Sequence, residues 1–191
     1  NALKTKSACR NYLILRDIFP QWAVDMGLLG KGLPYRLLKS VERHLYSVAN
    51  VIGVQTPANL PFFCNWASKP GHRVEVLQNW LADAPDVGCS ISVEDGPLAG
   101  RNIFVYAGNM GVAQGMGTLI DLAERFYSRE DVGFLFVGRG IEAQLLRTEA
   151  KDRKLDNVLF HEEIKAREIP GLYAQCHVGL VVLDPRHTTH N

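Results

Sequence analysis

The stretch Phe104-Val105-Tyr106-Ala107-Gly108-Asn109-Met110-Gly111 decides the fold expected for this 191-residue chain. Its first four residues form an apolar run that predicts a buried strand, and glycines bracket the loop that follows. An amphipathic segment, 115–129, comes next. A strand, a glycine turn and a helix start present backbone N–H groups at the positive end of a helix dipole, where phosphate binds well. We therefore predict a pyrophosphate-binding loop at Gly108–Gly111.

A second glycine loop follows the next apolar run. Residues 132–137 read as another buried strand, and Gly138-Arg139-Gly140 comes directly after it. Successive strands of a parallel sheet end at the same edge, so the two glycine loops should lie side by side. Arg139 is placed to reach a diphosphate there, although an arginine that caps a helix start would have the same position.

Apolar runs alternate with helical patterns from residue 102 onward. The expected strands are 103–107, 132–137, 158–160 and 177–183, and the expected helices are 115–129, 141–154 and 167–175. This alternation is typical of an α/β fold with a parallel sheet and right-handed crossovers. The sequence thus predicts a Rossmann-like domain over residues 101–191.

The first part of the chain shows the same alternation less completely. Strands are expected at 12–15, 51–54 and 74–77, and a helix at 35–49. Residues 82–100 are rich in Pro, Gly, Ser and Asp and have no clear period, as in a domain linker. We therefore divide the chain into a first domain at 1–82, a linker at 83–100 and a second domain at 101–191.

Composition excludes several classes of function. The chain has 21 basic and 20 acidic residues, a balance that argues against nucleic acid as a partner. Its four cysteines form no Cys-x-x-Cys pair, so we expect reduced thiols in a cytoplasmic protein. No histidine has a partner at ligand spacing, and no metal site is expected. No apolar run reaches the roughly 18 residues of a membrane span, so any membrane contact should be peripheral.

The order and spacing of several short motifs resemble the GT-B glycosyltransferases of the retaining family four. Within that family the chain looks most like the bacterial surface-polysaccharide enzymes that transfer aminodeoxysugars such as fucosamine. The motifs that carry the resemblance are Asp17-Ile18-Phe19-Pro20, Val51-Ile52-Gly53-Val54-Gln55-Thr56, Val76-Leu77-Gln78-Asn79-Trp80, Gly108-Asn109-Met110-Gly111 with Gln114-Gly115, Phe134-Leu135-Phe136-Val137-Gly138-Arg139-Gly140, Asn157-Val158-Leu159-Phe160 and Ile169-Pro170-Gly171-Leu172-Tyr173.

The resemblance implies a fold and a function. Residues 1–82 would be the C-terminal part of an acceptor-side Rossmann-like domain, and residues 101–191 a donor domain that stops before the family's Glu-x7-Glu segment. The whole enzyme would move an N-acetylated aminosugar or deoxysugar from a UDP-linked donor to a lipid-linked envelope polysaccharide, such as lipopolysaccharide. The anomeric configuration would be retained, and neither a metal nor another cofactor would be needed. The catalytic residues would lie outside this chain, which as a fragment is expected to bind a donor with or without turning it over.

The resemblance also implies roles for individual residues. The donor diphosphate would contact Gly108, Asn109, Met110, Gly111, Gln114 and Arg139. The nucleobase would lie near Gly138, Glu163 and Ile164, and Asp17 and Trp22 would face the acceptor cleft. Many family members have Arg and Lys where this chain has Asn109 and Gln114, so the grip on the diphosphate should rely on neutral hydrogen bonds.

Two other functions fit the same pattern. A sugar-nucleotide 2-epimerase would share the donor pocket, but we identify no acid and base residues for it. A non-catalytic nucleotide-sugar-binding module would need neither. The amphipathic stretch Leu28–Leu45, with its interspersed basic residues, could touch the inner face of a bacterial plasma membrane or could be an ordinary core-facing helix.

Overall fold

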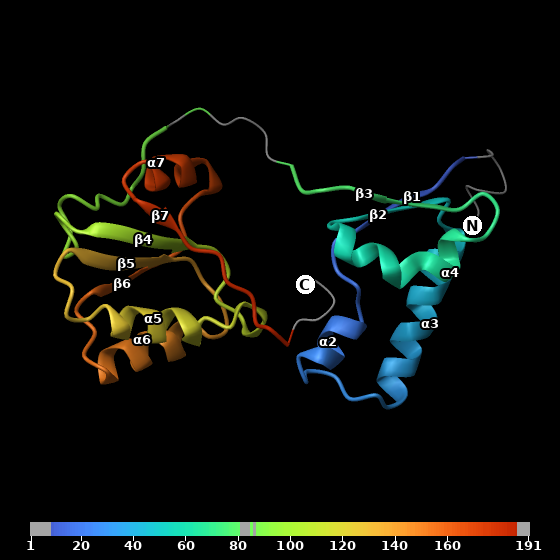
Figure 1. Ribbon diagram of the computed structural model, residues 1–191, viewed down its shortest axis with the longest axis horizontal. Coiled ribbons are helices and arrows are strands. Elements are labelled where there is room, and N and C mark those ends of the chain that lie inside the picture. Colours follow the sequence, from blue (N-terminus) through green and yellow to red (C-terminus); the bar gives the residue numbers. More distant parts are fainter. Residues whose placement is uncertain (1–8, 81–84, 86, 187–191) are drawn as a thin grey trace. The chain divides into compact units, whose positions relative to one another are not determined.

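The computed structural model describes residues 9–80, 85 and 87–186 of the chain (Figure 1). The chain divides into two compact units. Unit 1 consists of residues 1–81 and 185–191, and unit 2 of residues 82–184.

Unit 1 is built on a small parallel sheet in the order β1-β2-β3. Its elements are β1 (Tyr12–Leu15), α2 (Gln21–Asp25), α3 (Leu33–Val48), β2 (Val51–Val54), η1 (Pro57–Phe63), α4 (Cys64–Ala67) and β3 (Arg73–Val76). The core lies on one face of the sheet, where Ile52 and Val54 pack with Ile18, Ala49 and Phe63. The predicted strands therefore form, each within one residue of its expected bounds.

Unit 2 contains a parallel sheet in the order β6-β5-β4-β7. Its elements are β4 (Asn102–Ala107), η2 (Val112–Gln114), α5 (Gly117–Arg125), β5 (Val132–Val137), α6 (Ala143–Asp152), β6 (Val158–His161), η3 (Ala166–Glu168), α7 (Ile169–Tyr173) and β7 (Val178–Gly179). The chain winds from β4 outward to β6 and then returns to the other side of β4. This reversal of strand order is the arrangement that creates a ligand crevice at the carboxyl ends of the strands.

Both faces of this sheet are covered. Side chains alternate along each strand, so Phe134 and Phe136 pack under α5 and α6, whereas Leu135 and Val137 pack on the other face with Leu172 of α7. Figure 1 shows α5 and α6 on one side of the sheet and α7 on the other. The prediction of an α/β fold with parallel sheets is confirmed.

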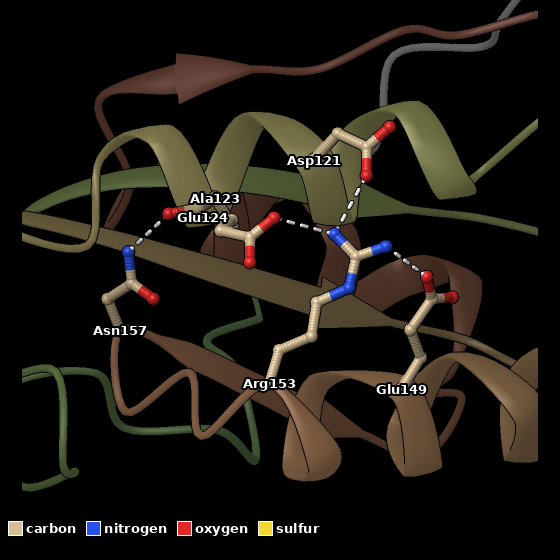
Figure 2. A network of polar contacts seen from close by, with 6 residues as sticks. All are labelled: Asp121, Ala123, Glu124, Glu149, Arg153 and Asn157. Atoms are coloured by element: carbon tan, nitrogen blue, oxygen red, sulfur yellow. Dashed lines mark hydrogen bonds and ion pairs between the residues drawn. The ribbon is translucent and has the colours of Figure 1, made fainter.

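A polar network holds α5 and α6 together at the surface (Figure 2). The Arg153 guanidinium donates to Asp121 and Glu124 of α5, each at 2.8 Å, and to Glu149 of α6. Asn157, fully buried before β6, donates from Nδ2 to the carbonyl oxygen of Ala123 at 2.8 Å. Its Oδ1 has no partner among the described residues. The network fixes both helices over the strands whose ends form the site described below.

The structure corrects three predicted segments. The stretch predicted as a linker contributes Ile91, Val93 and Leu98 to the core of unit 2, because three apolar side chains in irregular backbone can cover a sheet face without any period. The predicted helix 167–175 is a 3-10 turn followed by the short α7. Of the predicted strand 177–183, only Val178–Gly179 pairs with β4.

Candidate functional site

The two glycine loops of unit 2 are joined by hydrogen bonds. The amide of Gly108 donates to Val137 O at 2.9 Å, and the amide of Met110 donates to Arg139 O at 2.8 Å. These bonds continue the ladder between β4 and β5 beyond the ends of both strands. The loops after β4 and β5 therefore form one platform at the carboxyl edge of the sheet.

Close backbone contact explains the glycines of the second loop. A Cβ atom at Gly138 would lie 1.9 Å from Gly108 O, and the φ of Gly138 is +145°. A Cβ atom at Gly140 would lie 2.2 Å from Met110 O. A side chain at either position would have to push the loops apart, so glycine is required by the contact between the loops.

The platform changes the expected role of its amides. The N–H groups of Gly108 and Met110 are used between the loops, and that of Gly111 donates to Gln114 Oε1 at 3.0 Å. The prediction that the amides of the first loop all face a diphosphate is therefore wrong for these three, because the ladder and a side chain already satisfy them. Within the described residues, the amides of Asn109, Arg139 and Gly140 donate no hydrogen bond.

Side chains brace the first loop from both ends. The Tyr106 hydroxyl donates to Asn109 O at 2.6 Å, and Asn109 Nδ2 donates to Gln114 Oε1 at 3.2 Å. Burial raises the pKa of Tyr106, with a smaller contribution from Tyr173, so the hydroxyl keeps the proton that it donates. The sequence analysis missed Tyr106 because it read this residue only as part of an apolar strand.

Met110 does not belong to the site through its side chain. The side chain is fully buried in the core under α5 and α6. The apolar character of methionine makes this burial favourable in a loop that covers the sheet. Met110 therefore anchors the loop, and Gln114 braces it.

A pocket of about 390 Å³ opens at the ends of β4, β5 and β6. Six of the predicted donor-site residues line it together, namely Gly108, Asn109, Gly138, Arg139, Glu163 and Ile164. Ala166 and Ile169, from the start of the next helical turns, complete an apolar wall that the sequence analysis did not assign. The pocket thus has an amide-rich side at the glycine loops and a mixed apolar and acidic side after β6.

An ion pair crosses this pocket. Arg139 Nε lies 2.5 Å from Glu163 Oε2, and the two side chains are 78% and 52% exposed. An ion pair this exposed adds little to stability, so the guanidinium is free to exchange its partner for a stronger anion. Arg139 and Asn109 thus both line this pocket, one from each glycine loop.

The residues predicted for the acceptor side lie in unit 1. Asp17 is exposed in the bend after β1, and Trp22 is half-buried in α2, with its ring 6.2 Å from that of Phe19. A cavity of about 480 Å³ in this unit is lined by Ile18, Gln21, Lys39, Glu42, Arg43, Tyr46, Phe62 and Phe63. Asp17 and Trp22 do not line this cavity, and their acceptor role stays a prediction.

Buried polar groups form the wall of that cavity. Glu42 of α3 is 6% exposed, pairs with Lys39 at 2.6 Å and accepts a hydrogen bond from the Tyr46 hydroxyl at 3.2 Å. Burial, together with the neighbouring Glu42 carboxylate, raises the pKa of Tyr46. The sequence analysis missed this triad because a glutamate in an amphipathic helix usually faces solvent.

Among the described residues we find neither a cluster of metal-ligating side chains nor a helix that could span a membrane. His177 Nδ1 accepts from the amide of Ile103 at 3.0 Å, at the end of the sheet away from the pocket. No group of three or more His, Cys, Asp and Glu side chains converges within residues 9–80 and 87–186. Over the same ranges, no helix has the length and apolar character needed to cross a bilayer.

The chain is similar in sequence to a known glycosyl transferase. No protein-family model matches the chain. WcaI of Escherichia coli (strain K12), named as a colanic acid biosynthesis glycosyl transferase, is 27% identical over 196 residues, which cover 90% of this chain and 44% of WcaI. The chain therefore spans less than half the length of this relative.

Solved structures share the fold. One is Anabaena Alr3699/HepE in complex with UDP and glucose, which is 15% identical; the match covers 95% of this chain and 48% of that chain, with a TM-score of 0.67. Another is sucrose-phosphate synthase from Thermosynechococcus elongatus, which is 16% identical; the match covers 94% of this chain and 46% of that chain, with a TM-score of 0.63. A third is a G117R mutant of S. aureus TarM in complex with UDP and sugar ligands, which is 16% identical; the match covers 90% of this chain and 32% of that chain, with a TM-score of 0.57. These likenesses confirm the predicted GT-B-like fold of the chain.

Proposed function

We propose that the chain is the nucleotide-binding part of a glycosyltransferase that uses a UDP-linked sugar. The observation that carries this proposal is the pocket at the carboxyl edge of the unit 2 sheet, where two interlocked glycine loops meet Arg139. UDP is bound in the solved structures of HepE and TarM, which share the fold. The relative WcaI is named for polysaccharide biosynthesis, which supports a saccharide acceptor.

The proposed chemistry follows from charge at the leaving group. When the bond between the anomeric carbon and the diphosphate breaks, negative charge builds up on the diphosphate oxygens. The amides of Asn109 and Arg139, together with the Arg139 guanidinium, would stabilise that charge more in the transition state than in the ground state. Glu163 and Ile164 would border the nucleoside on the opposite side of the pocket.

The finer parts of the proposal concern sugar and acceptor. Asn109 and Gln114 give the first loop neutral donors and acceptors in place of the Arg and Lys of many family members, and the chain as a whole resembles the aminodeoxysugar branch. We infer an N-acetylated aminosugar or deoxysugar donor, a lipid-linked envelope saccharide as acceptor, and retention of the anomeric configuration. Unit 1 would contribute the acceptor side, unit 2 the donor side, and the reaction would take place at the cytoplasmic side of the membrane.

Donor competition followed by transfer tests this proposal. UDP-N-acetylglucosamine and UDP-glucose would each be titrated against UDP bound to this chain. The better donor would then be incubated with the whole enzyme of which the chain is the nucleotide-binding part and with a polyprenyl-diphosphate-linked saccharide. We expect the acetylated sugar to compete better and NMR of the product to show the donor's anomeric configuration. Isomerised sugar nucleotide formed without an acceptor would instead identify an epimerase. If neither donor displaced UDP, the proposed donor pocket would be rejected.

A further inference from the structure

The side chain of Tyr106 reaches from the core of unit 2 to the first glycine loop. Its residue is 8% exposed and packs in the cluster under α5 and α6 that also contains Met110. Its hydroxyl donates to Asn109 O at 2.6 Å. A Cβ atom at Gly108 would lie 3.3 Å from this hydroxyl, so the missing side chain of Gly108 leaves room for the phenol to reach the loop.

Both ends of one peptide group in this loop are bound. The carbonyl of Asn109 and the amide of Met110 belong to the same planar peptide. The carbonyl accepts from Tyr106, and the amide donates to Arg139 O at 2.8 Å. Rotation of the 109–110 peptide would break both hydrogen bonds, so one rigid group ties Tyr106 to the backbone of Arg139. Tyr106 therefore acts on the second glycine loop through the first.

The two hydrogen bonds of this peptide support each other. A donor at a peptide carbonyl draws electron density toward the oxygen, which makes the N–H of the same peptide a better donor. The Tyr106 hydroxyl thus strengthens the bond from the Met110 amide to Arg139 O. It also holds the carbonyl oxygen of Asn109, whose partial negative charge would repel an anion if the peptide turned.

The position of Arg139 depends on its backbone. Asn109 and Arg139 line the pocket at the carboxyl edge of the sheet, whereas Tyr106 does not line it. The Arg139 side chain is 78% exposed and pairs with Glu163, an exposed contact that holds it only weakly. The direction from which the guanidinium enters the pocket is therefore set by the loop backbone, which the 109–110 peptide holds in place.

We propose that Tyr106 is a positioning residue for diphosphate binding, which acts through the 109–110 peptide to hold Asn109 and Arg139 in the arrangement that binds the diphosphate. This inference deepens the proposed function and rests on it, because it requires a diphosphate in the unit 2 pocket. The link between the two loops exists without a ligand, so it is tested separately.

Hydrogen exchange followed by NMR tests the link itself. Tyr106→Phe removes the hydroxyl and keeps the ring in the core. We expect the Met110 amide to exchange about fivefold faster in this variant, because its peptide is then held at one end only. The Gly108 amide donates to Val137 O, outside the 109–110 peptide, and its exchange should change less than about twofold.

Calorimetric titration with UDP tests the positioning. Tyr106→Phe should bind UDP about fivefold more weakly than the unchanged chain. In a double-mutant cycle, the same change made in Arg139→Gln should weaken binding less than about twofold, because the guanidinium that Tyr106 positions is already absent. A merely structural role of the hydroxyl would lower the affinity equally in both backgrounds.

A matched control is Tyr127→Phe. Tyr127 is 50% exposed and follows the end of α5, whereas the first glycine loop precedes the start of that helix. The variant therefore removes the same hydroxyl group elsewhere in unit 2. We expect it to keep both the exchange rate of the Met110 amide and the UDP affinity of the unchanged chain.

Three results would overturn the inference. One is a Met110 amide that exchanges no faster in Tyr106→Phe, or one that is accelerated only as much as the Gly108 amide, which would mean a general loss of stability. Another is equal UDP affinity of Tyr106→Phe and Tyr127→Phe. The third is additive losses in the cycle with Arg139→Gln. If the unchanged chain bound no UDP, the proposed function would fail and the positioning role with it, while the exchange of Met110 would still show whether the link between the loops exists.

Discussion

Gly138→Ala places a methyl group where the two glycine loops touch. Its Cβ would lie 1.9 Å from Gly108 O, and its φ of +145° is a conformation that alanine rarely adopts. Holding a residue in such a sparsely populated region costs about 1–3 kcal/mol. Moving the Gly108 carbonyl away also strains the bond from the Gly108 amide to Val137 O, at about 1 kcal/mol. We expect a loss of about 3 kcal/mol in the unfolding free energy of unit 2.

Thermal unfolding measures this loss. For a domain of this size, about 3 kcal/mol corresponds to a fall in Tm of roughly 10–20 °C. Gly117→Ala is the control, since no heavy atom lies within 4 Å of the Cβ that it adds at the start of α5. Its Tm should stay near that of the unchanged chain. If Gly138→Ala had the same Tm as Gly117→Ala, the inferred close contact between the loops would be refuted.

Three further changes probe the loop, the core and a thiol. Gln114→Ala removes the acceptor of the Gly111 amide and should weaken UDP binding about fivefold, measured by calorimetry, with the fold retained; unchanged affinity would remove the bracing role. Asn157→Ala should lower the unfolding free energy in urea by about 1 kcal/mol, because the carbonyl of Ala123 loses one of its two donors and keeps the Phe126 amide; a loss under roughly 0.5 kcal/mol would contradict this. Burial, with a smaller effect of a neighbouring thiol, raises the pKa of Cys176 to about 11, so its proton is held longer in the folded chain than in the unfolded one. Stability should therefore fall as the pH rises from about 9 to about 11, and Cys176→Ala should flatten that fall; identical pH profiles would refute it.

The central strands of the parallel sheet were predictable because their signal is local. The apolar runs at 104–107 and 132–137 are long enough to be buried on both faces, and each ends in glycine. The pairing of β4 with β5 follows from a short right-handed crossover. The parallel sheet and the meeting of the glycine loops at one edge could thus be derived from the sequence.

Contacts between distant backbone segments were not predictable. Nothing in the spacing of Gly138 and Gly140 reveals that each lies against a carbonyl of the first loop. The pattern suggested free amides, whereas the inter-loop ladder uses those of Gly108 and Met110. A ladder that continues past the ends of its strands has no sequence signature of its own.

The sequence also did not predict which way the apolar side of an amphipathic helix faces. Periodicity shows that α3 has an apolar side, but not which way that side faces. The burial of Glu42 with Lys39 settles the rotation, and this pair can be seen only once the helix is placed on the sheet. Likewise, Ile91, Val93 and Leu98 follow no helix or strand period. Their segment was therefore predicted to be a linker, although these side chains pack on the sheet of unit 2.

Calorimetric titration with UDP, GDP and ADP tests the central claim most directly, namely that the unit 2 pocket holds a uridine diphosphate. The account predicts micromolar binding of UDP, weaker binding of GDP and ADP, and about tenfold weaker UDP binding by Arg139→Gln, because a charge-assisted contact is lost. Arg129→Gln, which removes another exposed arginine paired with an acid, should bind UDP like the unchanged chain. Absence of UDP binding, or equal affinity of the unchanged chain and Arg139→Gln, would contradict the account.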